Sequence, residues 1–504
     1  MRARNVKATG YERSEAMGRE TISKLLLRFS GPAILASETA AFYNLFDAIW
    51  CGRLGAEAVA ALSVAHPLMT IYRAIGGGIG VGAASLIARN LGAGKKEETN
   101  KTASCGIAFC ARALGFKVRR YHMNEGHSSL LALELLRKYN MDVNRVRDLC
   151  IFTTHTPIEA GIDKFPYEVV EEIMGELVPL ENLKNLGGDD RLNMTRLALN
   201  LSQYINGVAI RHRDSSREMF PGYAINAITN GIHSYTWTCE SFRKLYDLYL
   251  PGWANEPGLL ARTEIIPNEE IWEAHKEAKQ GLINYINETT DVDMHHDTLT
   301  IGFARRATGY KRATLIFSDL EKLRKVNRKG KIQLVLAGKA HPKDLDGKRI
   351  IQEIFDHIKK LKDEIKIVYL EDYDLRLAGK LILGVDLWLN TPLPPLEASG
   401  TSGMKAAHNG VINFSVLDGW WVEGWIEDVT GWAIGPHPSK SLPDEERKIR
   451  ELDDLYNKLE YVILPMFYQR RDDWIRMMKN SIGNLAYYFD SHRMMLRYVM
   501  EAYL

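Results

Sequence analysis

The segment PLPPLEASGTSGMKAAHNG, residues 392–410, has residue types and spacing that suit the binding of a phosphate group. Gly400 and Gly403 allow the backbone to approach an anion closely, and the N–H groups at the start of a helix favour negative charge. Thr401 adds a hydroxyl, and Lys405 follows it by about one helical turn. We therefore expect an anion site with an amine beside it.

A second group of residues that could bind a ligand or take part in a reaction lies in ARRATGYKRA, residues 304–313. It contains Arg305, Arg306, Tyr310 and Lys311. These residues follow a predicted strand, and ligands of a parallel sheet bind outside the carboxyl ends of its strands. Clustered cations at that edge would bind anionic groups. An exposed basic loop before a helix is the alternative interpretation.

The elements that must position both groups form an alternating series from Thr298 onward. Short apolar runs rich in β-branched residues predict strands, and amphipathic segments between them predict helices, which together indicate a doubly wound parallel sheet. Strands are expected at 298–303, 331–338, 365–370 and 385–390, with helices at 312–325, 349–362 and 373–384. From 118 to 290 the pattern is mostly helical, with short extended runs such as CIFTTHTP, and two amphipathic helices are expected after Leu442.

The segment EASGTSGMKAAHNGV resembles the cofactor-lysine signature of glycogen and α-glucan phosphorylases. The resemblance extends over about residues 110–504. It implies that Lys405 carries pyridoxal 5′-phosphate, with Thr401 and Gly400 at the cofactor phosphate. Glu397 and Ser399, again with Gly400, would contact the glucosyl unit that is transferred.

ARRATGYKRA has the same spacing as its counterpart in the family. The resemblance implies Arg305 near the cofactor phosphate, Arg306 and Lys311 on orthophosphate, and Tyr310 on a sugar hydroxyl. Arg305 stands where the family commonly has lysine, which preserves the charge but not the geometry.

Three shorter segments are also similar to the family. ITNGIHSYTW implies that Asn230 contacts the sugar and that Trp237 packs near the cofactor. YDLRLA implies that Tyr373 stacks on the cofactor, and TTHTP implies that His155 bonds the glucose 6-hydroxyl.

The implied fold is α/β: a two-lobed GT-B-like glycosyltransferase with a doubly wound sheet in the C-terminal lobe, 298–504, and an incomplete N-terminal lobe, 110–297. The implied reaction is reversible phosphorolysis of an α-1,4-glucan or maltodextrin by orthophosphate, giving glucose 1-phosphate with retention. Arg306, Lys311 and Lys405 would be its catalytic residues, and the cofactor would act through its 5′-phosphate. The family's glycine-rich loop, LGNGGLGR or similar, is not found in this chain.

The first 109 residues differ in character. Apolar runs at 25–50 and 58–91 are long enough to cross a bilayer, and flanking basic residues place both ends of such a hairpin in the cytoplasm. A buried helical pair is the alternative. Residues of about 20–109 resemble the first two helices of multidrug and toxic compound extrusion transporters, which predicts an all-α membrane-type hairpin before a cytoplasmic catalytic part.

Composition argues against several other classes of protein. A formal net charge of +2, from 65 basic and 63 acidic residues, gives no bulk attraction for nucleic acid. Five cysteines without paired CxxC spacing indicate neither a disulfide framework nor a metal site. The alternatives left open are a catalytically impaired hybrid or membrane-anchored fragment, a nucleotide-sugar glucan synthase, and transport by the hairpin; the oligomeric state is not indicated.

Overall fold

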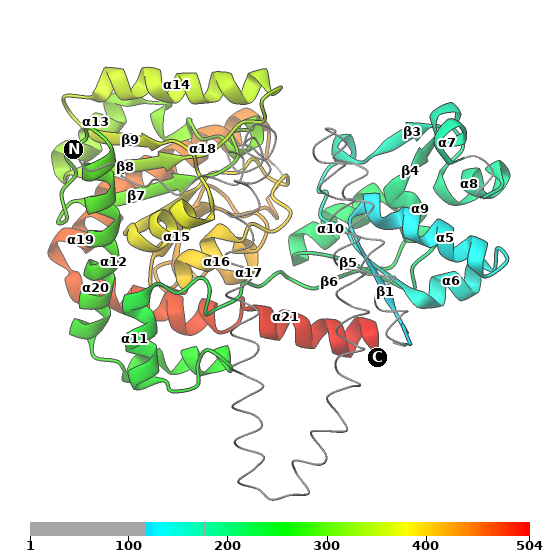
Figure 1. The fold of residues 1–504 in the computed structure, drawn as a ribbon. Helices are drawn as coiled ribbons and strands as arrows, with labels where there is room; N and C mark the ends of the chain where they lie inside the picture. Colours follow the sequence, from blue (N-terminus) through cyan, green and yellow to red (C-terminus); the bar gives the residue numbers. More distant parts are fainter. Residues whose placement is uncertain (1–116, 175–177, 441) are drawn as a thin grey trace, which may run out of the picture. The chain divides into compact units, whose positions relative to one another are not determined.

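The computed structural model describes residues 117–174, 178–440 and 442–504. Its contacts divide the chain between Arg119 and Arg120, and nearly all described residues belong to the second unit, Arg120–Leu504 (Figure 1). Among the described residues no helix is long and apolar enough to cross a membrane. The hairpin predicted for residues 1–109 lies outside the described residues.

A six-stranded parallel sheet forms the centre of the C-terminal part, in the order β12-β11-β10-β7-β8-β9. Its strands are β7 (Leu299–Ala304), β8 (Ile332–Ala337), β9 (Lys366–Leu370), β10 (Leu387–Asn390), β11 (Ile412–Val416) and β12 (Gly431–Ile434). The order reverses between β7 and β10. Such a switch point opens a crevice at the carboxyl ends of the two strands.

Alternate residues of these strands supply two separate cores. On β8, Leu334 and Leu336 pack into one core, while Val335 and Ala337 pack into the other. A parallel sheet covered on both faces reads as a continuous apolar run, which is why the strand predictions at 298–303, 331–338, 365–370 and 385–390 are confirmed.

Helices connect these strands, and aspartates begin three of them. The N-cap side chains of Asp319, Asp344 and Asp374 accept backbone N–H groups of α13, α14 and α15. The prediction that a helix starts at Arg312 is wrong, because that residue adopts φ 48° and a 3-10 turn follows it. The bounds are η4 Gly309–Lys311, η5 Leu315–Phe317, α13 Leu320–Lys329, α14 Leu345–Leu361, α15 Leu375–Gly384, α16 Ser402–Ala407 and α17 Trp421–Gly424.

Residues 121–227 form a smaller parallel sheet in the order β1-β2-β5-β6. Its strands have only three or four residues each, and the helical pattern of this region hid β1, β5 and β6. The strands are β1 Tyr121–Asn124, β2 Cys150–Thr153, β5 Tyr204–Gly207 and β6 Ile225–Ala227, with the antiparallel pair β3 Lys164–Pro166 and β4 Arg191–Asn193. The helices are η1 Gly126–Ser129, α5 Leu130–Lys138, α6 Val143–Leu149, η2 Glu159–Gly161, α7 Tyr167–Met174, α8 Leu180–Gly187, α9 Met194–Asn200 and α10 Ile210–Met219.

The last helices join the two sheets. The C-terminal series packs beside β12 and then reaches the smaller sheet, where Tyr498 and Ala502 pack against Ile151. His122 contacts the Tyr503 hydroxyl at 2.8 Å. The remaining bounds are α11 Glu240–Tyr249, η3 Pro257–Ile265, α12 Asn268–Thr289, α18 Asp444–Lys458, η6 Leu459–Ile463, α19 Leu464–Gln469, α20 Arg471–Ser481, η7 Ile482–Ala486, α21 Ser491–Tyr498 and η8 Val499–Tyr503.

Candidate functional site

The loop between β10 and α16 carries the first group of predicted site residues. It turns sharply at Gly400, whose φ is 77° and where an added Cβ would lie 3.1 Å from the Glu397 carboxylate. The positive φ favours glycine here, and an added Cβ would also require the Glu397 side chain to shift. The helix that follows has only six residues, and the Lys405 N–H donates to the Thr401 carbonyl at 3.2 Å.

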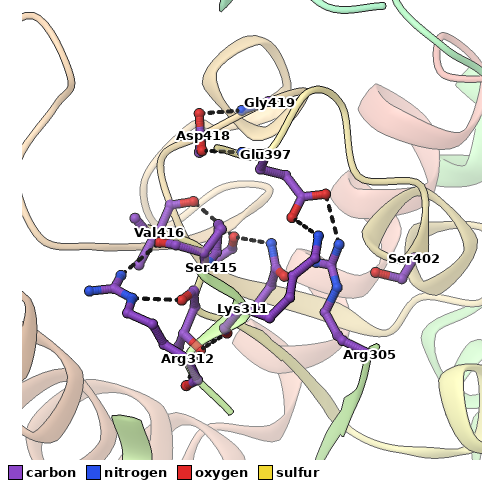
Figure 2. A network of polar contacts seen from close by, with 12 residues as sticks. Arg305, Lys311, Arg312, Glu397, Ser402, Ser415, Val416, Asp418 and Gly419 are labelled. Atoms are coloured by element: carbon purple, nitrogen blue, oxygen red, sulfur yellow. Dashed lines mark hydrogen bonds and ion pairs between the residues drawn. The ribbon is translucent and has the colours of Figure 1, made fainter. Parts of the chain in front are cut away.

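The Glu397 carboxylate lies between two cations that follow β7 (Figure 2). The Arg305 guanidinium donates to Glu397 at 2.7 Å and also to the Asn390 side chain, while the Lys311 ammonium donates to the second carboxylate oxygen. Burial raises the pKa of Glu397, but the two cations outweigh it and hold the pKa below its ordinary value. Glu397 is therefore an ionised acceptor.

Burial has the opposite consequence for Lys311. Desolvation, reinforced by the nearby Arg305 charge, lowers the pKa of Lys311 to about 8, although Glu397 opposes the shift. The ammonium can therefore release its proton near pH 8, and an anion bound beside it would favour the protonated form.

A cavity of about 470 Å³ opens beside this ion-pair cluster. Residues from the loops after β2, β7 and β10 line it, together with two residues that flank β6 and α10. Predicted site residues among its lining are His155, Asn230, Arg305, Tyr310, Glu397, Ser399, Gly400 and Thr401. Both sheets therefore contribute to the cavity.

Lys405 lies over the indole of Trp237, with its Nζ 3.7 Å from the ring centroid. Within the described ranges its ammonium has no ion-pair partner. Burial, with a smaller effect from the Arg305 charge, lowers the pKa of Lys405 to about 8. A lysine with a lowered pKa offers more neutral amine, and therefore a better nucleophile, near neutral pH.

The remaining predicted residues are not part of the cavity's lining. Tyr373 precedes α15 and packs against the same core as Trp237, and burial raises the pKa of Tyr373 to about 12. Arg306 is exposed, and its charge acts on Tyr310, whose pKa is raised by burial. Lys311 reaches the cavity's wall through its ion pair with Glu397.

The smaller sheet supplies His155, in the loop that follows β2. Its backbone N–H donates to the Glu125 carboxylate at 2.7 Å, and its Nε2 contacts Asn124 Oδ1 at 2.5 Å. Burial lowers the pKa of His155, with Glu125 opposing. Asn230 is fixed through its backbone, since its N–H donates to Val208 at 3.1 Å.

Two residues of the site were missed by the sequence interpretation. Asn390, the last residue of β10, accepts from Arg305, and Asp418, two residues after β11, accepts the Glu397 N–H at 2.8 Å. The rule that pointed to Arg305, a polar residue at the carboxyl end of a buried strand, applies to both and could have found them.

The family model for carbohydrate phosphorylases matches residues 176–431, and the MatE family model matches residues 32–113. The chain belongs to the carbohydrate phosphorylase family. The resemblance read from EASGTSGMKAAHNGV and the transporter-like resemblance of the first 109 residues are both confirmed as matches.

Similar proteins include the maltodextrin phosphorylase of Thermococcus litoralis, which is 39% identical over 78% of this chain and 52% of its own length. The glycogen phosphorylase of Aquifex aeolicus is 35% identical over 79% of this chain and 64% of its own length. The glycogen phosphorylase of Mycobacterium tuberculosis is 32% identical over 76% of this chain and 51% of its own length. The chain thus spans about half to two thirds of the length of these relatives.

Proposed function

We propose that this chain carries out reversible phosphorolysis of an α-1,4-glucan, with orthophosphate as the acceptor and glucose 1-phosphate as the product, with retention at the anomeric carbon. The proposed architecture is a two-lobed GT-B-like glycosyltransferase. The observation that supports it most strongly is the cavity that joins the Glu397 and Arg305 ion pair to His155 and Asn230 of the other sheet. A sugar needs such hydrogen-bonding groups on several sides.

The residues around Lys405 fit pyridoxal 5′-phosphate, the cofactor used in this family. The lowered pKa of the Lys405 amine favours condensation with a carbonyl, and the indole of Trp237 beside it offers an apolar face for an aromatic ring. The Ser399 hydroxyl is buried without a hydrogen-bond partner among the described residues, and so it has capacity for a ligand. Bound there, the cofactor would supply a phosphate that exchanges a proton with orthophosphate.

The protein's own groups would then bind and orient the reactants. Arg305, with Gly400 and Thr401, would hold the cofactor phosphate, and Lys311 with Arg306 would hold orthophosphate beside it. Cations placed where negative charge gathers also stabilise an oxocarbenium-like transition state, because they hold the attacking anion below the sugar. Trp237 and Tyr373 would pack against the cofactor ring.

The glucosyl unit would be held by hydrogen bonds. Glu397 is an ionised acceptor at the cavity wall, and Ser399 and Tyr310 offer hydroxyl groups. His155 and Asn230 would contact the sugar from the opposite side. A carboxylate among neutral donors suits the recognition of a neutral, hydroxyl-rich substrate.

The test of cofactor binding is borohydride reduction of the purified protein in the presence of pyridoxal phosphate. We expect a pyridoxyl adduct on Lys405, located by peptide mass spectrometry, and no adduct at that peptide in Lys405→Ala. The matched control is Lys348→Ala, which removes an exposed lysine of α14. Labelling spread evenly over surface lysines would sink the assignment.

The test of the reaction is release of glucose 1-phosphate from maltodextrin and orthophosphate. The wild-type chain and Lys348→Ala should release it at equal rates, whereas Lys405→Ala should release none above background. Transfer of glucose from a nucleotide sugar without orthophosphate would replace the proposal with that of a glucan synthase.

The second candidate is a hybrid chain that binds the cofactor but turns over poorly. It is favoured by the transporter-family match at residues 32–113, next to a phosphorylase match. A Lys405 adduct without glucose 1-phosphate release would select it. Sequencing single long molecules through the codons for residues 90–125 tests whether the junction exists in a genome.

A further inference from the structure

Asp418 lies beneath the loop that carries Glu397 and is 1% exposed. One of its carboxylate oxygens accepts the Glu397 N–H at 2.8 Å, and the other accepts the Gly419 N–H at 3.0 Å (Figure 2). Both are bonds from backbone groups to a charged acceptor, which are stronger than bonds to a neutral one. No side-chain cation of the described residues forms an ion pair with Asp418.

The turn at residues 418–420 also contacts the loop at Ser399. The Trp420 N–H donates to the Ser399 carbonyl at 2.8 Å. Gly419 makes this approach feasible, because its φ is 54° and an added Cβ would lie 2.3 Å from the Ser399 oxygen. Residues 418–420 therefore hold the segment 397–399 by its backbone at both ends.

We propose that Asp418 is a positioning residue of the glucosyl site, whose carboxylate holds the backbone at Glu397 so that the Glu397 side chain stays between Arg305 and Lys311. The inference rests on the proposed function for the identity of the ligand, a glucosyl phosphate. It does not rest on it for the mechanics of the loop. Asp418 forms no hydrogen bond or ion pair with Arg305 or Lys311 and holds Glu397 through its backbone, although the Asp418 charge also acts to raise the pKa of Lys311.

The protonation state of Asp418 changes near neutral pH. Burial raises the pKa of Asp418 to about 7, and the Glu397 charge adds to this, while the two N–H bonds and the Arg211 charge oppose it. Protonation removes charge from the acceptor of the Glu397 N–H. We therefore expect the loop to loosen as the pH falls through 7.

The groups that face Asp418 come from three other elements. The Arg211 charge, on α10, lowers the pKa of Asp418, and the Asp418 charge in turn acts to raise the pKa values of Tyr310 and Lys311 in η4. On α17, Glu423 is directed away, because it accepts from Thr229 at 2.7 Å and from the Ile210 N–H. Burial raises the pKa of Glu423 as well, and Lys311 has a pKa of about 8. Titration of Lys311 would change the affinity for glucose 1-phosphate above pH 7, whereas titration of Asp418 would change it below.

The first measurement is hydrogen exchange of the peptide spanning residues 394–404, compared between wild type and Asp418→Asn from pH 6 to 8. Rates are corrected for intrinsic exchange. We expect about tenfold faster exchange in the variant at pH 7.5, because a bond to a charged acceptor is lost. The wild-type loop should approach the variant's rate at pH 6. Equal exchange at all pH values would overturn the inference without reference to any ligand.

The second measurement is calorimetric binding of glucose 1-phosphate. Asp418→Asn should bind about tenfold more weakly at pH 7.5 and should lose the decline in affinity that wild type shows from pH 7.5 to 6. Gly419→Ala should displace the loop at its other contact, the Ser399 carbonyl. This variant should therefore bind glucose 1-phosphate weakly but keep the decline in affinity from pH 7.5 to 6. The matched control Asp363→Asn, at an exposed aspartate, should match wild type.

The outcomes separate this inference from the proposed function. If wild type binds no glucose 1-phosphate while the exchange difference persists, the proposed function fails and the role of Asp418 in holding the loop stands. If wild type binds it and Asp418→Asn binds equally well with the same pH dependence, the positioning role is wrong. Should Asp418→Asn not fold, Gly419→Ala still reports whether this turn controls the loop.

Discussion

The large sheet has a similar buried ion-pair cluster at each end, and only one of them can meet a ligand. At the amino ends of β7 and β10, Asp386 pairs with Lys279 at 2.6 Å and His275 at 2.8 Å. At the carboxyl ends of the same strands, Glu397 pairs with Arg305 and Lys311. Each cluster places one carboxylate between two basic side chains.

The two clusters differ in what surrounds them. Asp386 is 1% exposed and also accepts the Thr300 N–H at 2.7 Å, while Lys279 donates to the Thr298 carbonyl as well. Those contacts satisfy the Asp386 carboxylate and the Lys279 ammonium internally and tie α12 to the sheet, while His275 Nδ1 has no hydrogen-bond partner among the described residues. Glu397 instead lines the 470 Å³ cavity. A carboxylate between two basic side chains therefore serves the fold at one end and is available to a ligand at the other.

The two clusters should differ most in how far the free energy of unfolding falls when the carboxylate of each is removed. Asp386→Ala leaves the ammonium of Lys279, 3% exposed, without its partner, and we expect the free energy of unfolding to fall by about 3–5 kcal/mol. Urea denaturation at pH 7 measures it. Asp363→Ala, at an exposed site, should stay within about 0.5 kcal/mol of wild type. A loss under about 1 kcal/mol for Asp386→Ala would show that this cluster does not stabilise the fold.

Glu397→Gln should cost less stability, about 1 kcal/mol, because water and ions in the cavity can take over the contacts of Arg305 and Lys311. An anion should then occupy the vacated position. We expect sulfate to raise the Tm of Glu397→Gln more than that of wild type, and to raise the Tm of Asp386→Asn no more than that of wild type. Thermal unfolding with increasing sulfate checks this. An equal sulfate response in all three proteins would remove the distinction between the two clusters.

The sequence predicts the cluster at the carboxyl ends of β7 and β10 better than the cluster at their amino ends. Buried parallel strands read as continuous apolar runs, and so the loops after β7 and β10 were placed correctly beside each other. The pattern could not show that Glu397 would neutralise Arg305 and Lys311, since ion pairs between distant loops leave no periodicity. Asp386 and Asp418 escaped notice because a single aspartate beside a strand is common, and only burial distinguishes it.

The smallest expected effect is the change in Tm when one lysine at each end of the sheet is replaced by methionine. The sign of this change should differ between the two ends. The folded-state pKa of Lys405 lies near 8, below its unfolded value, so its charge costs stability at pH 7 and this cost fades as the pH rises from 8 toward 10.5. Lys405→Met should therefore raise the Tm slightly at pH 7, by about 1–3 °C, and less at pH 9.5. Lys279→Met should lower it at both, because Asp386 loses its partner. A stabilising Lys279→Met would mean that the sealed cluster costs more than it contributes, and the two ends of the sheet would then differ in access alone.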